Sequence, residues 1–250
     1  MNPGYLNTTN LFHLYDDIGR NVSTVNLDIL NDYSLISAQG TAWPNCVYNI
    51  NKAASYDDTV LNIQKSIFEL PVKPLLISVD NNELDKTLRK NGYFPVEQWV
   101  GMHIQVYPEG QFAKPTATTI HFITDINRIT EWVKVVSEVL FKGKTLQQDI
   151  FTYLFEQKHY FIFIEKDKKI IGTSLIYIDE GNIAGIYMFC IMPAYQGMGL
   201  GKSLLKYCLS LILKSGRDKC ILQSTKMGLR LYESVGFERS NTYNLFIKIK

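Results

Sequence analysis

The sequence predicts a mixed α/β (α+β) fold in which helices flank a central mixed, largely antiparallel sheet. Two patterns in the second half of the chain carry this prediction. Three apolar, β-rich runs follow one another with short polar turns between them, which is typical of an antiparallel meander. Amphipathic helical patterns precede and follow that meander, so helices are expected on the faces of the sheet.

The elements of the second half begin with helices and then change to the period of strands. A helix is predicted over 126–141, where apolar side chains recur at helical spacing and Gly143 can end the helix. The remaining predicted elements are a helix near 145–157, strands over 160–164, 169–178, 183–191 and 220–223, helices over 202–214 and 228–234, and a final strand over 242–250.

Length and composition favour a globular protein of two domains. The chain has 250 residues, of which 46% are hydrophobic and 20% charged, and domains usually hold roughly 100–150 residues. No stretch provides the roughly 20 consecutive apolar residues that a membrane span needs. The first four residues show no basic stretch followed by an apolar run. We therefore expect a cytoplasmic protein without a signal peptide or a membrane partner.

The cysteines are interpreted as buried, reduced thiols. They form no CxxC pair and no metal-ligand spacing with the four histidines, so no metal site is expected. The four residues are Cys46, Cys190, Cys208 and Cys220.

A segment with two prolines and a glycine, residues 108–116, is predicted to be a linker between residues 1–112 and residues 113–250. The first part holds 7 basic and 12 acidic side chains, and the second holds 19 basic and 12 acidic ones. The basic excess suits an anionic ligand in the second part. Its lysines are scattered along many elements and form no stripe, so no nucleic-acid partner is expected.

A glycine-rich loop at residues 196–202 joins a predicted strand to a predicted helix. Gly197, Gly199 and Gly201 alternate with larger residues, and the helix begins at once. Backbone N–H groups at a helix N-terminus have no intrahelical partner and face the positive end of the helix dipole. Glycines let a phosphate approach those groups closely. The loop therefore predicts an anion site.

Two nucleotide-binding motifs fail on this loop. The dinucleotide motif G-x-G-x-x-G needs a third glycine where Lys202 stands, and the nucleotide P-loop needs its first glycine where Gln196 stands. The pattern that the loop meets is Q/R-x-x-G-x-G/A, with Gln196, Gly199 and Gly201.

On this motif, residues 113–250 resemble the GNAT superfamily of acyl-CoA-dependent N-acetyltransferases. The resemblance includes Ile191-Met192-Pro193 before the loop and the segment 231–237, Leu-Tyr-Glu-Ser-Val-Gly-Phe, after it. It implies a GNAT-like fold and acetyl-CoA as cosubstrate.

The resemblance also implies a role for each matching residue. The strand end at Cys190, Ile191 and Met192 would pair with the pantetheine arm, and Tyr232 would act as general acid. Thr225 stands where the family often has an asparagine. The residues expected to cradle the pyrophosphate are Gln196, Gly197, Met198, Gly199, Leu200, Gly201 and Lys202.

No general base is evident in the sequence. The predicted strand 183–191 contains no acid, Asp179 and Glu180 are interpreted as a solvated turn, and His159 is interpreted as a strand-edge residue. No Cys/His nucleophile pair is visible, which favours direct attack by a primary amine, of a small molecule or a peptide, in a ternary complex. Because the base is missing, a non-catalytic acyl-CoA-binding or sensor protein remains the alternative.

The first half shows a weak similarity to the end of the second. Residues 76–92 and 221–236 share a strand, a helix and a glycine in the same order, each followed by an aromatic-bearing strand. Residues 49–54 contain no glycine, so the anion loop is absent there. We interpret residues 1–112 as a degenerate GNAT-like half in tandem with the second, the alternative being an unrelated accessory α/β domain.

Overall fold

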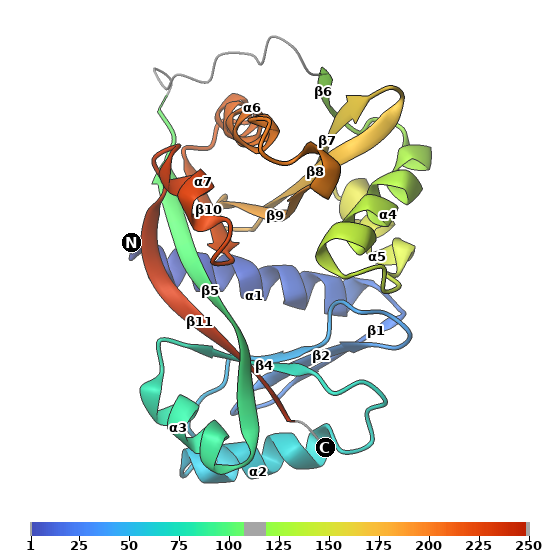
Figure 1. Cartoon of the computed structure of the whole chain (residues 1–250). Helices are drawn as coiled ribbons and strands as arrows, with labels where there is room; N and C mark the ends of the chain where they lie inside the picture. The colour runs from blue at the N-terminus through green and yellow to red at the C-terminus, as the bar shows by residue number, and fades with distance from the viewer. Residues whose placement is uncertain (1, 108–118, 249–250) are drawn as a thin grey trace.

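The computed structural model describes residues 2–107 and 119–248 (Figure 1). Its strands form one eleven-stranded sheet in the order β1-β2-β3-β4-β11-β5-β10-β9-β8-β7-β6. Most neighbouring strands are antiparallel, and two pairs, β3 with β4 and β9 with β10, are parallel. The predicted fold class, a mixed and largely antiparallel sheet with flanking helices, is confirmed.

The first half of the chain contains a helix, three successive strands and then two further helix–strand units. Its elements are α1 (Pro3–Asn21), β1 (Val25–Ile29), β2 (Ser34–Ala38), β3 (Cys46–Tyr48), α2 (Tyr56–Ser66), β4 (Leu75–Val79), α3 (Asn82–Lys90) and β5 (Tyr93–Gln105). The sequence pattern did not predict α1, β1 or β2. Helix α1 begins where the Asn2 side chain accepts a hydrogen bond from the Gly4 N–H and Pro3 takes the first helical position.

The second half follows the predicted order closely. Its elements are β6 (Thr119–Phe122), η1 (Ile126–Arg128), α4 (Ile129–Leu140), α5 (Gln148–Glu156), β7 (Tyr160–Lys166), β8 (Lys169–Ile178), β9 (Ala184–Ile191), η2 (Pro193–Tyr195), α6 (Leu200–Lys214), β10 (Lys219–Ser224), α7 (Leu229–Glu233) and β11 (Glu238–Lys248). Strand β6 is an addition to the prediction. The predicted linker 108–116 and the boundary between 112 and 113 lie outside the described residues.

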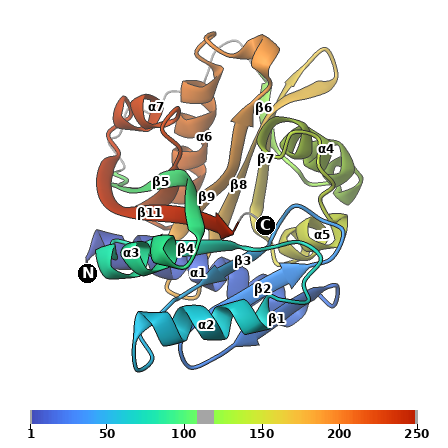
Figure 2. The same ribbon diagram turned by 60° about the horizontal axis from the view of Figure 1, so that its bottom comes forward.

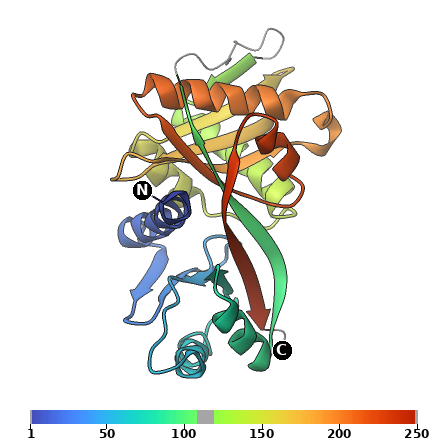
Figure 3. The ribbon, with the colours of Figure 1, turned by 90° about the vertical axis from the view of Figure 1, so that its left-hand side faces the viewer.

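The sheet is arranged symmetrically about its two longest strands, β5 and β11. Strand β5, from the first half, lies between β10 and β11, and β11, from the second half, lies between β4 and β5. Figure 3 shows these two strands running side by side from one end of the molecule to the other. The last strand of each half therefore pairs with a strand of the other half: β5 with β10, and β11 with β4.

Alternation of side chains along β7 divides the core between two faces of the sheet. Phe161 and Phe163 pack with α4 and α5, whereas Ile162 and Ile164 pack with α6. Figure 2 shows α4 and α6 on opposite faces of β7, β8 and β9. The four cysteines are buried free thiols, as predicted. Within the described residues, no helix is long and apolar enough to cross a membrane.

Candidate active site

The glycine loop connects the end of β9 to the start of α6. Gly197 and Gly199 have φ values of +77° and +76°, and a Cβ atom added at either would meet nothing within 4 Å. Residues with a side chain rarely adopt this left-handed region, so the turn depends on glycine. Gln196 anchors the loop, because its Nε2 donates a 2.9 Å hydrogen bond to the carbonyl of Ile191.

The N-terminus of α6 is open to an anion. Its N-cap, Gly199, offers no side-chain hydrogen bond, and its first turn contains no acidic residue. The N–H groups of residues 197–202 find no acceptor among the described residues, while that of Ser203 already bonds the Gly199 carbonyl. Lys202 is exposed in the same turn. Unpaired donors, the helix dipole and a nearby cation together favour a bound phosphate.

The corresponding helix of the first half, α2, differs from α6 in its side-chain cap and in the charge of its first turn. Ser55 caps it by accepting a 3.1 Å hydrogen bond from the Asp58 N–H. Its first turn carries Asp57 and Asp58, which repel an anion. The two helix starts therefore differ in chemistry, although each helix connects two neighbouring parallel strands, β3 and β4 for α2 and β9 and β10 for α6.

Strands β9 and β10 diverge beside the loop. Their parallel pairing covers only Ala184, Gly185 and Ile186, and it stops at Ile186↔Leu222. Beyond that point the side of β9 that faces β10 has no partner strand, and Cys190, Ile191 and Met192 lie in this stretch. Met192 keeps its place on the other side, where its N–H donates to the Ile171 carbonyl at 2.9 Å. An extended chain can be bound along such an edge.

A bulge interrupts β9 in the middle of this stretch. Thr173 pairs with Cys190 but Leu175 pairs with Tyr187, so two residues of β9 oppose one of β8. Met188 adopts φ +48°, and its carbonyl accepts a 2.9 Å hydrogen bond from Thr173 Oγ1. Bulges re-aim side chains and occur next to active sites. Sequence reasoning missed this one, because methionine gives no signal for a left-handed residue.

Tyr232 lies on α7 within an aromatic cluster. Its ring centroid is 5.8 Å from that of Phe189 on β9 and 5.8 Å from that of Phe237. The residue is only 8% exposed, and its hydroxyl bonds to none of the described residues. Burial raises the pKa of the Tyr232 phenol well above its usual range, so it is protonated at neutral pH.

Gly201 lets α7 approach the loop closely, and Gly228 leaves room for the Tyr232 ring at the start of α7. A Cβ atom at Gly201 would lie 3.3 Å from Leu231 Cδ2 and 4.0 Å from Phe189, so the helix start, β9 and α7 meet there. A Cβ atom at Gly228 would lie 2.8 Å from the Tyr232 ring. Thr225 stands exposed before this turn, and its carbonyl accepts hydrogen bonds from the Gly228 N–H and Ser224 Oγ. The predicted residues of the loop, the strand end and α7 thus gather around the divergence of β9 and β10.

Of the three residues weighed as bases, Asp179 and His159 are engaged in local structure, whereas Glu180 is exposed. The interpretation of Asp179 as solvated is wrong: it is buried, and its carboxylate accepts from Asn10 Nδ2 at 2.8 Å and the Ile183 N–H at 2.9 Å. Its neighbour Glu180 is exposed, as expected. His159 Nδ1 accepts from the Ile178 N–H at 3.3 Å, and burial lowers the pKa of this imidazole to about 4. Neither the Asp179 carboxylate nor the His159 imidazole therefore serves as a free proton acceptor where β9 and β10 diverge.

Comparison with known proteins agrees with this geometry. A model of the acetyltransferase (GNAT) domain matches residues 126–246. A mycothiol acetyltransferase from Thermomonospora curvata is 33% identical over 78 residues, which is 30% of this chain and 26% of that protein. The match thus spans about a quarter of the curated relative.

Solved structures extend the likeness to the whole chain. A GCN5-related N-acetyltransferase from Kribbella flavida has a TM-score of 0.73 at 13% identity, covering 98% of this chain and 95% of its own. Another, from Sphaerobacter thermophilus, has a TM-score of 0.65 at 14% identity, covering 92% and 84%. At these identities the likeness concerns the fold, and it includes the first half. The chain therefore contains a GNAT acetyltransferase domain, at residues 126–246.

Proposed function

We propose that this protein transfers an acetyl or another short acyl group from acyl-CoA to a primary amine by direct attack in a ternary complex. The observation that carries the proposal is the open N-terminus of α6, where six consecutive N–H groups find no acceptor among the described residues. An anion that fits these donors and an extended arm along the adjacent strand edge together match CoA.

CoA would be held at two places. The N–H groups of residues 197–202 would bind its pyrophosphate, with Gln196 holding the loop and Lys202 supplying positive charge. The edge formed by Cys190, Ile191 and Met192 would pair with the amides of the pantetheine arm, and exposed Thr225 would contact the cofactor from the β10 side. No group of three or more metal-ligating side chains occurs among the described residues, and the proposal uses none.

Acyl-CoA supplies the acyl group as an activated thioester. The amine nitrogen forms a bond to the acyl carbon, the carbon–sulfur bond breaks, and the sulfur takes a proton from Tyr232. The Tyr232 hydroxyl is available for this role because it is bonded to no described residue. The amine gives its surplus proton to water, since Asp179 and His159 are engaged elsewhere. The Tyr232 phenolate then takes a proton back from water, which restores the enzyme and leaves free CoA thiol and the N-acylated amine as products.

We further propose that residues 1–112 are a degenerate GNAT-like half and that residues 113–250 form the transferase domain. The arrangement of β3, β4, β11 and β5 repeats that of β9, β10, β5 and β11, which supports a common origin for the halves. The capped, acidic start of α2 explains why the first half would not bind CoA.

The test is a steady-state assay of free thiol released from acetyl-CoA across a panel of primary amines. We expect release that depends on the amine and produces the N-acetylated product in equal amount. Stoichiometric CoA binding with no amine-dependent release would instead identify a non-catalytic acyl-CoA-binding protein. Absence of CoA binding would refute both.

A further inference from the structure

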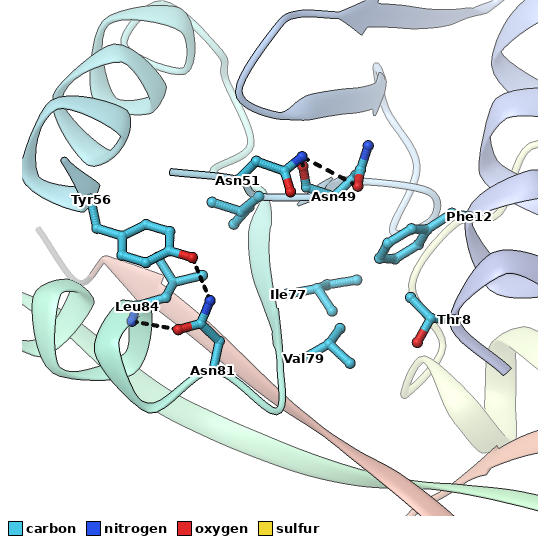
Figure 4. A pocket seen from close by; sticks show the side chains of 10 residues that line it. Thr8, Phe12, Asn49, Asn51, Tyr56, Ile77, Val79, Asn81 and Leu84 are labelled. Atoms are coloured by element: carbon cyan, nitrogen blue, oxygen red, sulfur yellow. Dashed lines mark hydrogen bonds between the residues drawn. The ribbon is translucent and has the colours of Figure 1, made fainter. Parts of the chain in front are cut away.

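A hollow of about 240 Å³ lies in the first half between the diverging ends of β3 and β4 (Figure 4). Ile77 and Val79 of β4 form one side, and Asn49 and Asn51 follow β3 on the other. At roughly 30 Å³ per water molecule, the volume corresponds to about eight waters. The hollow is therefore large enough for a ligand of about dipeptide size.

The hollow exists because β3 and β4 separate after two residue pairs. Their parallel pairing consists of Cys46↔Leu75 and Val47↔Leu76. Asn49 then adopts φ +51°, and the Asn51 N–H donates to the Asp32 carbonyl, away from β4. The side of β4 opposite β11 thus loses its partner strand at residues 77–79, as β9 does beside β10.

The lining of the hollow is polar but uncharged. Tyr56 Oη accepts a 2.6 Å hydrogen bond from Asn81 Nδ2, so the proton of the Tyr56 hydroxyl is available to an acceptor. Asn51 Nδ2 donates to the Asn49 carbonyl at 3.0 Å, which leaves Asn51 Oδ1 to accept from a ligand. Within the described part of the chain, no lining residue carries a charge. Donors and acceptors side by side on an apolar floor suit a secondary amide.

A phosphate is excluded from this hollow by the start of α2. Ser55 and Thr59 already accept hydrogen bonds from two N–H groups at this start, those of Asp58 and Ala53. Asp57 and Asp58 add negative charge in the first turn. A ligand that carries a pyrophosphate would meet repulsion where α6 offers attraction.

The geometry points to a binding site in this hollow for a short, uncharged amide chain in an extended conformation. Its amides would pair with the free side of residues 77–79 of β4, as an added strand does. Tyr56 would donate to one of its carbonyls, and Asn51 would accept from one of its N–H groups. Peptides and the pantetheine arm of CoA both contain secondary amides in an extended chain. They differ in that the arm of CoA ends in a pyrophosphate, whereas a peptide need not carry a charge.

The experiment uses the full chain and titrates N-acetyl-alanyl-alanine amide while amide spectra are followed by NMR. We expect saturable shifts confined to residues around β3, β4 and α2. Tyr56→Phe keeps the ring and removes the donor, so it should weaken binding about fivefold, as expected for one neutral hydrogen bond. Tyr5→Phe, on an exposed tyrosine of α1, is the matched control and should leave the affinity unchanged.

Further arms separate this site from the acetyltransferase site. Val79→Trp, at a half-buried lining position, should fill the hollow and abolish binding, while Gly199→Asp should leave it intact. Pantetheine competing for the same Tyr56-dependent site would assign it to a cofactor arm, and no competition would assign it to a peptide. No saturable binding of either compound, or binding unaffected by both Tyr56→Phe and Val79→Trp, would overturn the inference.

Discussion

Replacing Gly199 by aspartate perturbs the proposed anion site at its centre. A carboxylate at the N-cap of α6 would accept hydrogen bonds from the N–H groups that are open in the native protein. It would also place a negative charge next to the phosphate oxygens. Both effects oppose CoA, and the left-handed φ of Gly199 adds a backbone penalty for a residue with a side chain.

The magnitude follows from the exposure of the loop. Two unit charges about 4 Å apart repel by about 1 kcal/mol in bulk water and by about 4 kcal/mol at an effective dielectric constant of about 20. Residues 197–199 are exposed and Leu200 is half-buried, which places the site between these limits. We therefore expect a loss of at least about 2 kcal/mol, or about 30-fold in Kd.

The assay is a calorimetric titration with CoA, and Gly216→Asp is its matched control. Gly216 has φ +78° and open space around its Cβ position, as Gly199 has, but it follows the opposite end of α6. Both variants bear the same backbone penalty, about 1–2 kcal/mol. Only Gly199→Asp should lose affinity. Equal CoA affinity in wild type and Gly199→Asp would refute the assignment of the loop.

Four other outcomes are expected. CoA should bind with one site per chain by calorimetry, because the start of α2 is capped; two equivalents would contradict this. Tyr232→Phe should lower kcat by about 10²–10⁴-fold with little change in the acyl-CoA Kd, whereas an unchanged kcat would leave Tyr232 a packing residue. Asn7→Leu should cost about 2–4 kcal/mol in urea unfolding, since Asn7 Nδ2 donates to the buried carbonyls of Met102 and Leu222, and a loss under 1 kcal/mol would argue against this bridge. The pKa of His159 is lowered to about 4 in the folded protein, so the unfolded chain takes up a proton first as the pH falls. The free energy of unfolding should therefore decrease between about pH 6.5 and pH 4. His159→Gln should reduce this dependence of stability on pH, and an identical dependence would exclude His159 as its source.

Most of the second half was predictable because its signals are local. The meander is encoded by alternating side chains and polar turns, and α6 by a glycine loop followed by helical spacing. The predicted strand 169–178 coincides with β8 (Lys169–Ile178). In the first half, β1 and β2 are short strands with few turn signals, and α1 is weakly amphipathic, so the sequence pattern did not reveal them.

The candidate site was predictable in its loop and only partly in its surroundings. Gln196 and the three glycines predict an anion site from a single segment of sequence. The packing of Phe189 on Tyr232 joins elements more than 40 residues apart, and the bulge at Met188 depends on a left-handed residue that a methionine does not signal. Asp179 was misread because its partner, Asn10, lies on a helix at the other end of the chain.

By itself, therefore, the sequence determined the local elements of the second half, the anion loop and the family to which its motif points. The tertiary structure alone decided that β5 pairs with β10 and β11 with β4, that Asp179 is buried, and that a hollow lies beside β4. The physical reason is the range of the interactions: capping, turns and side-chain periodicity act over a few residues. Strand order and the burial of polar groups depend on which distant segments meet.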